Sequence, residues 1–121
     1  MNLEQLKAAE VNLGERTYPI FVGVGLLEKL GEALTQLVPR VTKCVVVTSP
    51  KIRELFGDRM LEGLGSLKAS IILVPDGEAA KTWDNVSSLI GELLDHGIDR
   101  NDVVLALGGG AVGDLAGFVA S

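Results

Sequence analysis

The segment Asp102-Val-Val-Leu-Ala-Leu-Gly-Gly-Gly-Ala-Val-Gly-Asp114 is the most informative part of the 121-residue sequence. Its first half, Val103–Leu107, is a short apolar run, which is typical of a strand buried on both faces of a parallel sheet. Three glycines follow the run, and a helical pattern begins after Asp114. A strand, a glycine turn and a helix N-terminus form an anion site, because free N–H groups and the helix dipole point at the turn. The segment therefore predicts a loop that holds the phosphates of a nucleotide.

The sequence before this segment alternates between extended and helical patterns. Apolar periodicity, capping residues and turn residues predict a hairpin of strands at 10–13 and 18–23, a helix at 26–38, a strand at 43–48, a helix at 50–64, a strand at 69–74 and a helix at 83–95. Such alternation means a parallel sheet with helices on both faces and right-handed crossovers. We therefore expect an α/β fold with a Rossmann-like parallel sheet, flanking helices and an N-terminal β-hairpin.

Two of the expected helices have clear start signals. Ser49 is suited to cap the helix at 50–64, and Pro50 fits its first position, where a backbone N–H would have no partner. Thr82 is suited to cap the helix at 83–95. The apolar stripe expected to bury this last helix consists of Val86, Leu89, Ile90, Leu93 and Leu94.

Composition limits the class of protein. With 47% hydrophobic and 22% charged residues, the chain is expected to bury a core as one domain. Its net charge of −5 argues against a nucleic-acid partner, which would need a basic surface. No run reaches the ~18 apolar residues that a membrane span needs, and the first residues lack the order of a signal peptide. The single cysteine, Cys44, lies beside a valine run and fits a buried, inert thiol in a reducing cytoplasm.

Three loops follow the expected strands, at residues 48–51, 75–81 and 108–114. Ligands of open α/β sheets bind at the carboxyl ends of the strands, so these loops are expected to share one site. Gly108–Gly113 satisfies the pattern Gly-x-Gly-x-x-Gly between a strand and a helix, but such a match alone is weak and also fits a tight turn. Asp114 would repel a phosphate and suits a sugar hydroxyl or a cation; alternatively, it only complements the helix dipole.

The segment Asp76-Gly-Glu-Ala-Ala-Lys81 places two carboxylates and an ammonium group in the turn before a helix. Glu78 and Lys81 are three residues apart and would share one face of a helical turn, with Glu78 accepting from hydroxyl groups and Lys81 facing an anion. The alternative is a solvated turn with a surface ion pair worth ~0–1 kcal/mol.

Trp83 either joins the core or covers the nucleotide pocket. His96 has no neighbouring His or Cys cluster and is expected to complement a helix dipole rather than to bind a metal.

Two motifs, Pro75-Asp-Gly-Glu-x-x-Lys-Thr82 and Gly108-Gly-Gly-Ala-Val-Gly-Asp-Leu-Ala-Gly-Phe-Val-Ala-Ser121, together resemble the N-terminal domain of 3-dehydroquinate synthase. The segment Asn12-Leu-Gly-Glu-Arg-Thr-Tyr-Pro-Ile20 and the turn Gly23-Val-Gly25 are similar to the opening hairpin of that family. The resemblance covers nearly the whole chain from about residue 10, and the combination of the two motifs is specific.

The resemblance implies a two-domain enzyme, with an α/β nucleotide-binding domain followed by a helical domain. The implied reaction converts 3-deoxy-D-arabino-heptulosonate 7-phosphate to 3-dehydroquinate and phosphate in the shikimate pathway. NAD⁺ would oxidise a secondary alcohol transiently and be regenerated, and a divalent metal, zinc or cobalt, would polarise the carbonyl. The resemblance also implies a sugar-phosphate substrate and a cytoplasmic homodimer.

The resemblance assigns cofactor contacts to the residues that match the two motifs. Asp76, Gly77, Glu78, Ala79, Ala80 and Lys81 match the NAD-binding segment, and Gly109, Gly110, Ala111, Val112, Gly113 and Asp114 match the loop that holds the pyrophosphate. Ser49 stands where many members have Asp or Asn against the adenosine ribose, and its shorter side chain supports that role only weakly. Members often have valine in place of Ala111, a difference that should leave the backbone contacts intact.

The metal ligands of the family, a glutamate and two histidines, lie in its helical C-terminal domain with most of the substrate-binding residues. That domain is absent from the sequence, which stops at Ser121 soon after the glycine loop. We therefore expect the chain to be a fragment of a longer enzyme, inactive by itself and at best a weak binder of NAD⁺.

Other interpretations stay open. Related sugar-phosphate cyclases share both motifs, and metal-dependent polyol dehydrogenases share the fold and a similar glycine loop; the Glu78 and Lys81 pair and the run Gly113–Phe118 favour the synthase. A stand-alone nucleotide-binding module without chemistry is a hypothesis from another class, against which the stop at Ser121 argues.

Overall fold

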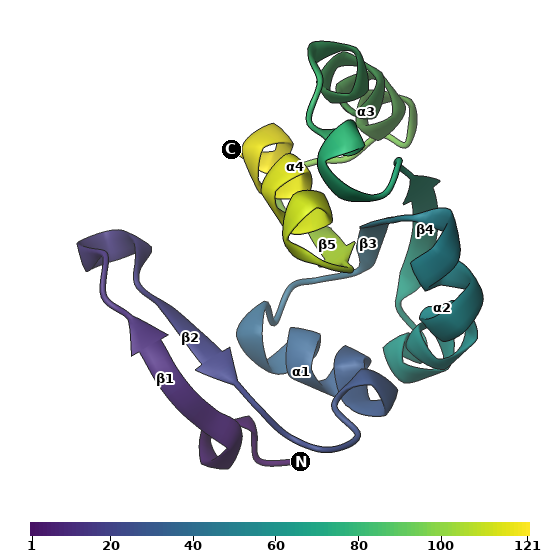
Figure 1. Cartoon of the computed structure of the whole chain (residues 1–121). Coiled ribbons are helices and arrows are strands. Elements are labelled where there is room, and N and C mark those ends of the chain that lie inside the picture. Colours follow the sequence, from purple (N-terminus) through teal and green to yellow (C-terminus); the bar gives the residue numbers. More distant parts are fainter.

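The computed structural model describes residues 1–121, which form a parallel α/β unit with a β-hairpin beside it (Figure 1). The strands are β1 (Lys7–Val11), β2 (Tyr18–Phe21), β3 (Lys43–Thr48), β4 (Lys68–Leu73) and β5 (Val103–Leu107). The α-helices are α1 (Leu30–Leu37), α2 (Pro50–Leu64), α3 (Trp83–Asp95) and α4 (Gly110–Ala120), and short 3-10 helices are η1 (Leu3–Leu6), η2 (Gly14–Arg16), η3 (Leu27–Lys29) and η4 (Gly77–Ala80). The predicted alternation is confirmed, although the helix expected at 26–38 divides into η3 and α1, and the first hairpin strand begins earlier, at Lys7.

The central strand of the main sheet is β3, because the strand order is β4–β3–β5 with both pairings parallel. Its residues Cys44, Val45, Val46, Val47 and Thr48 are at most 1% exposed. A strand with neighbours on both sides and helices on both faces has no surface left for water, which explains why its apolar run does not alternate with polar residues.

The position of β5 corrects the sequence prediction. Val103–Leu107 was expected to be buried on both faces, but this strand pairs only with β3 and lies at the sheet edge. Its residues are half-buried, and Ala106 is exposed. A continuous apolar run identifies a strand, but it does not determine how many neighbours that strand has in the sheet.

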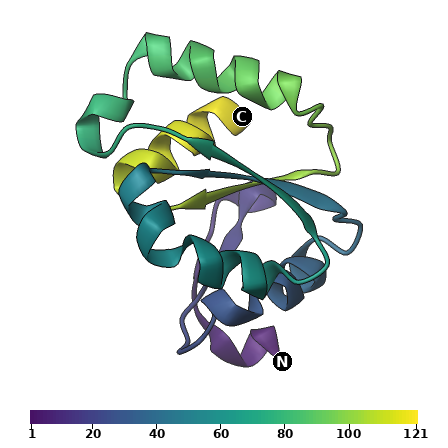
Figure 2. The same ribbon diagram turned by 90° about the vertical axis from the view of Figure 1, so that its right-hand side faces the viewer.

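Two cores form on opposite faces of the sheet because successive side chains of β3 point in opposite directions. Val45 and Val47 pack with residues of α3 and α4, whereas Cys44 and Val46 pack with residues of α1 and α2. The two pairs of helices accordingly lie on opposite sides of the strands (Figure 2). The prediction of a Rossmann-like sheet with flanking helices is confirmed.

Only part of the stripe predicted for α3 is buried. Leu89 and Leu93 are 1% and 6% exposed, and Val86 packs against them at the edge of the core. Ile90 and Leu94 are 42% and 70% exposed, so their assignment to the core was wrong. Each lies one residue, or about 100° of helix rotation, beyond the buried row, and α3 touches the core along a narrow stripe only.

Two glycines allow η3 and the first turn of α1 to approach the C-terminal end of α2. A Cβ atom on Gly31 would lie 2.6 Å from the carbonyl oxygen of Leu64, and a Cβ atom on Gly63 would overlap the carbonyl oxygen of Leu27. The obstacles are backbone atoms, which cannot move aside as a flexible side chain could. Close helix packing on this face therefore requires that residues 31 and 63 have no side chain.

The Lys43 ammonium group joins the end of α3 to the start of β5. It donates to the carbonyl oxygen of Gly97 at 3.0 Å and lies 3.4 Å from Oδ2 of Asp102, whose side chain is 3% exposed. The same carboxylate oxygen accepts from the backbone N–H of Asp99 at 2.8 Å. A buried carboxylate needs such partners, and together they fix the point at which the chain enters β5.

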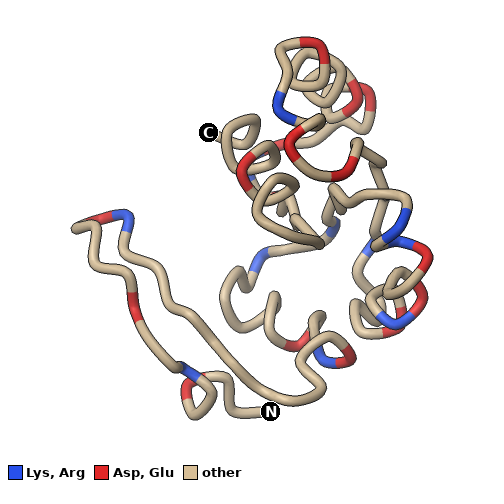
Figure 3. The backbone as a smooth tube through the Cα atoms, viewed as in Figure 1, with Lys and Arg blue, Asp and Glu red and all other residues tan.

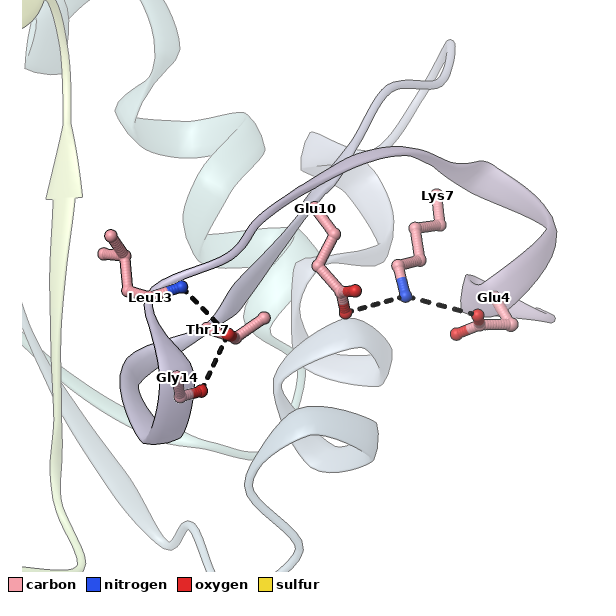
Figure 4. A network of polar contacts seen from close by, with 6 residues as sticks. All are labelled: Glu4, Lys7, Glu10, Leu13, Gly14 and Thr17. Atoms are coloured by element: carbon pink, nitrogen blue, oxygen red, sulfur yellow. Dashed lines mark hydrogen bonds and ion pairs between the residues drawn. The ribbon is translucent and has the colours of Figure 1, made fainter.

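Local hydrogen bonds shape the β1–β2 hairpin, which is confirmed as antiparallel (Figure 4). The Thr17 hydroxyl donates to the carbonyl oxygen of Gly14 at 2.7 Å and accepts from the N–H of Leu13 at 3.0 Å. Gly14 has φ +66°, which favours glycine. At the other end, the hydrogen bond to Glu10 is the largest of the contributions that raise the pKa of Lys7.

Replacing Gly63 by alanine should lower the free energy of unfolding by roughly 1–3 kcal/mol, because the added methyl group meets fixed backbone atoms. Gly91→Ala in α3 is the matched control, since its Cβ would have nothing within 4 Å; it should raise stability by about 0.5–1 kcal/mol through helix propensity. Urea denaturation measures both effects. A Gly63→Ala chain as stable as the parent would contradict the close packing of η3 on α2.

Candidate functional site

The carboxyl ends of β3, β4 and β5 meet at one edge of the sheet, and Thr48 holds them together. Its hydroxyl group donates to the carbonyl oxygen of Leu107 at the end of β5, at 2.7 Å. Its carbonyl oxygen accepts from the N–H of Val74 just after β4, at 2.8 Å. Thr48 is fully buried, so it positions the three following loops without reaching a ligand. Sequence analysis did not single out this residue, although a threonine that follows three valines at the end of a strand is a usable signal.

A hollow of about 470 Å³ lies at this edge and is lined by all three loops. The lining residues that the sequence predicted are Ser49 after β3, Asp76, Gly77, Glu78 and Lys81 after β4, and Gly109, Gly110, Ala111, Val112 and Asp114 after β5. Ile52 of α2 also contributes. Three predicted site residues, Ala79, Ala80 and Gly113, do not line the hollow. The structure thus brings together ten of the thirteen predicted residues.

The glycine loop presents unpartnered backbone N–H groups at the start of α4. Gly108 has φ +150°, which favours glycine, and Gly109 occupies the N-cap position. The first hydrogen bond of the helix runs from the N–H of Gly113 to the carbonyl oxygen of Gly109 at 3.2 Å. The N–H groups of residues 110–112 form no hydrogen bond inside the chain, and at a helix N-terminus such groups favour an anion.

Gly109 and Gly110 leave space that the protein itself does not fill. Neither has the positive φ that favours glycine, and a Cβ atom on either residue would have no neighbour within 4 Å. Neither backbone conformation nor internal packing therefore requires glycine at these positions. Close approach of a ligand to the main chain would require it.

The segment Asp76–Lys81 is anchored by its middle. Ala80 is fully buried in the core that α3 and α4 share, and Gly77 has φ +64°. The Asn85 side chain donates to the carbonyl oxygen of Ala79 at 3.1 Å, while its N–H donates to the capping hydroxyl of Thr82. The predicted cap of α3 is confirmed, and Asn85 is a further positioning residue that sequence analysis missed.

An ion pair joins the two loops that carry the motifs. Lys81 Nζ lies 2.9 Å from Asp114 Oδ2 and 3.5 Å from Glu78 Oε1. The hydrogen bond to Asp114 is the largest cause that raises the pKa of Lys81, and the charges of Asp114 and Glu78 add to it. The expected contact between Glu78 and Lys81 is present, but the shorter contact is with Asp114, which spacing in the sequence could not indicate.

Ser49 is confirmed as the N-cap of α2. Its Oγ accepts from the N–H of Ile52 at 3.4 Å, and the residue is fully buried, with Pro50 at the first helical position. The hydroxyl group therefore caps the first turn of α2 where Ser49 lines the hollow. A contact between Ser49 and a ribose stays a prediction.

Trp83 does not join the core. It is 78% exposed, and its ring meets the ring of Phe118 edge to face, with 6.2 Å between centroids. The two rings border a second, mainly apolar hollow of about 370 Å³, which shares Lys81 and Asp114 with the first. The ion pair thus stands between a polar and an apolar hollow.

Cys44 and His96 line neither hollow. Burial raises the pKa of Cys44, which is 1% exposed, as expected of an unreactive thiol. His96 lies at the end of α3, and its carbonyl oxygen accepts from Lys43. No group of three His, Cys, Asp or Glu side chains is arranged to hold a metal ion.

None of the helices has both the length and the hydropathy needed to span a bilayer. Basic and acidic positions are mixed along α2 and the hairpin (Figure 3).

Comparison with known proteins shows which family this chain is similar to. Residues 71–121 match the family model described as 3-dehydroquinate synthase N-terminal. The 3-dehydroquinate synthases of Desulforamulus reducens, Azotobacter vinelandii and Methylococcus capsulatus are 40%, 38% and 41% identical to this chain over 93%, 96% and 96% of its length. Over nearly its whole length, the chain is similar to members of the 3-dehydroquinate synthase family. It spans about a third of the length of these relatives, 31–32%.

A solved structure has the same fold as this chain. A crystal structure of 2-deoxy-scyllo-inosose synthase, complexed with carbaglucose-6-phosphate, NAD⁺ and Co²⁺, superposes with a TM-score of 0.77. The superposition covers 93% of this chain and 31% of that protein, with 22% sequence identity. The likeness shows a common α/β architecture.

Asp114→Asn should lower the pKa of Lys81 towards its usual value of 10.5, because the carboxylate of Asp114 is the main cause of the rise. Since the folded-state pKa is raised, the stabilising effect of the pair is complete below the usual pKa and is lost as the pH rises through the folded-state value. NMR titration of the Lys81 side chain measures the shift. Glu78→Gln should have the smaller effect, and an unchanged pKa in Asp114→Asn would exclude the pairing.

Proposed function

We propose that this chain is the nucleotide-binding part of a 3-dehydroquinate synthase, and that the hollow at the ends of β3, β4 and β5 holds NAD⁺. The proposal is supported by the likeness to 3-dehydroquinate synthases and by the convergence of the two motifs on one hollow. The single observation that carries it is the open space beside the main chain at Gly109 and Gly110, called the cradle below. Neither the backbone conformation nor the packing inside the chain requires glycine at these two positions.

The residues around this cradle fit a dinucleotide. The free N–H groups of residues 110–112 would face the pyrophosphate, which suits the positive end of the α4 dipole. Lys81 supplies a positive charge beside it. The carboxylates of Asp76, Glu78 and Asp114 would accept hydrogen bonds from ribose hydroxyl groups. Gly77, Ala79, Ala80 and Gly113 would contribute through backbone shape rather than side chains.

The proposed whole-protein reaction is the conversion of 3-deoxy-D-arabino-heptulosonate 7-phosphate to 3-dehydroquinate and phosphate. Bound NAD⁺ would supply a reversible hydride acceptor for a secondary alcohol of the substrate. The residues of this chain would bind and orient the dinucleotide through the glycine loop and the segment Asp76–Lys81. Contacts to the sugar phosphate and to a divalent metal ion, zinc or cobalt, would come from other residues of a cytoplasmic homodimer.

A related sugar-phosphate cyclase is the second candidate. It is favoured by the likeness to 2-deoxy-scyllo-inosose synthase, which was solved with NAD⁺ and a sugar-phosphate analogue. The higher identity to 3-dehydroquinate synthases, 38–41% in the three relatives named above, favours the synthase. Both candidates require the same NAD⁺ site, so the choice between them affects the substrate and not the role of this chain.

Gly110→Ala should weaken NAD⁺ binding at least about tenfold, because a methyl group would enter the cradle and displace the pyrophosphate from the backbone. Its stability should not fall, since alanine is favoured over glycine in a helix. Gly117→Ala, on the same helix and equally free of neighbours but outside the hollow, is the matched control and should bind NAD⁺ like the parent. Isothermal titration calorimetry measures both. Equal binding by the two variants would rule out the cradle.

The 121-residue chain should not form 3-dehydroquinate by itself, because no group of three His, Cys, Asp or Glu side chains in it is arranged to hold a metal ion, and the resemblance implies that the metal and substrate ligands belong to other residues. A coupled assay of phosphate release, with NAD⁺ and Co²⁺ or Zn²⁺ added, measures the activity. Metal-dependent turnover by this chain would show that these ligands were wrongly placed outside it.

A further inference from the structure

The hollow contains more negative than positive side-chain charge. Lys81 is its only cationic lining residue, whereas Asp76, Glu78 and Asp114 each bring a carboxylate. A pyrophosphate group entering this space would meet favourable N–H groups at the start of α4 and repulsion from the carboxylates. The balance between the two determines which anions the site accepts.

Lys81 already forms ion pairs within the chain. Its ammonium group lies 2.9 Å from Asp114 and 3.5 Å from Glu78, so it holds two carboxylates at once. The Asp114 side chain is 68% exposed and that of Glu78 is 83% exposed, which leaves both free to rearrange. An anion that uses Lys81 must therefore compete with Asp114 for it.

Asp114 is the stronger of the two competitors by geometry. It has the shorter contact, and it projects from α4, the helix whose N-terminus would hold the phosphates. A free pyrophosphate ion offers this carboxylate only negative charge. A nucleotide also offers ribose hydroxyl groups, which can donate to it and offset the lost contact with Lys81.

We propose that Asp114 is a specificity-determining residue, which lowers the affinity of the site for free phosphate anions and thereby favours a nucleotide over inorganic pyrophosphate or phosphate. The inference rests on the proposed NAD⁺ site. Specificity of this kind is a difference between two affinities, set by repulsion of the wrong ligand as well as by attraction of the right one. It matters for the proposed reaction because inorganic phosphate is one of its products and would otherwise occupy the glycine loop.

Asp114→Asn tests the inference because it removes the charge and keeps the size of the side chain. Inorganic pyrophosphate should bind about fivefold more tightly to this variant than to the parent, as expected from loss of one exposed charge interaction. The gain should shrink at high salt, where such interactions are screened. The affinity for NAD⁺ should not rise, because the ribose contact is weakened. NMR titration of the amide signals of residues 109–113 measures both ligands.

Two further variants serve as controls. Asp84→Asn removes an exposed carboxylate from the first turn of α3, outside the hollow, and should leave pyrophosphate binding unchanged. Lys81→Gln should weaken it. Pyrophosphate binding that is unchanged or weaker in Asp114→Asn overturns the inference, and leaves the proposed function standing if the parent binds NAD⁺ at the glycine loop. Absence of both NAD⁺ and pyrophosphate binding in the parent overturns the two together.

Discussion

The burial of β3 on both faces is the constraint on which the rest of the structure depends. Its valines leave no polar face for water, so each face needs its own pair of helices, and each side needs a neighbouring strand. The crossover connections then return over the two faces, and all three strands run in the same direction. Parallel strands bring their following loops to the same edge, so the location of the hollow is a consequence of how this strand is buried.

At the same edge, buried residues with a structural role are distinct from the groups that face the hollow. Thr48 and Ser49 are fully buried, and their hydroxyl groups hold the strand ends and the start of α2. Ala80 fixes the second loop in the core. The groups that face the hollow are backbone N–H groups and exposed charged side chains, whose positions these buried residues determine. A sheet edge fixed by buried residues, with exposed charged side chains beside it, is suited to hold a ligand in one orientation.

Much of this arrangement could be predicted from sequence. The strand at 43–48, the helix at 50–64 with its Ser49 cap and the three converging loops follow from apolar patterns and turn residues, which are local properties. The edge position of β5 and the exposure of Leu94 could not be predicted, because burial depends on how many neighbours an element has. The contact of Lys81 with Asp114 could not either, since it joins residues 33 positions apart through side-chain conformation.

A crystal structure of this chain with NAD⁺ most directly tests whether the three loops form one nucleotide site. The pyrophosphate oxygens should lie within about 3.2 Å of backbone nitrogens at the start of α4, the distance of an ordinary N–H···O hydrogen bond. The ribose groups should lie against the carboxylates that line the hollow. A nucleotide bound elsewhere, for example between Trp83 and Phe118, with the glycine loop vacant, would contradict the assignment of the hollow as the NAD⁺ site.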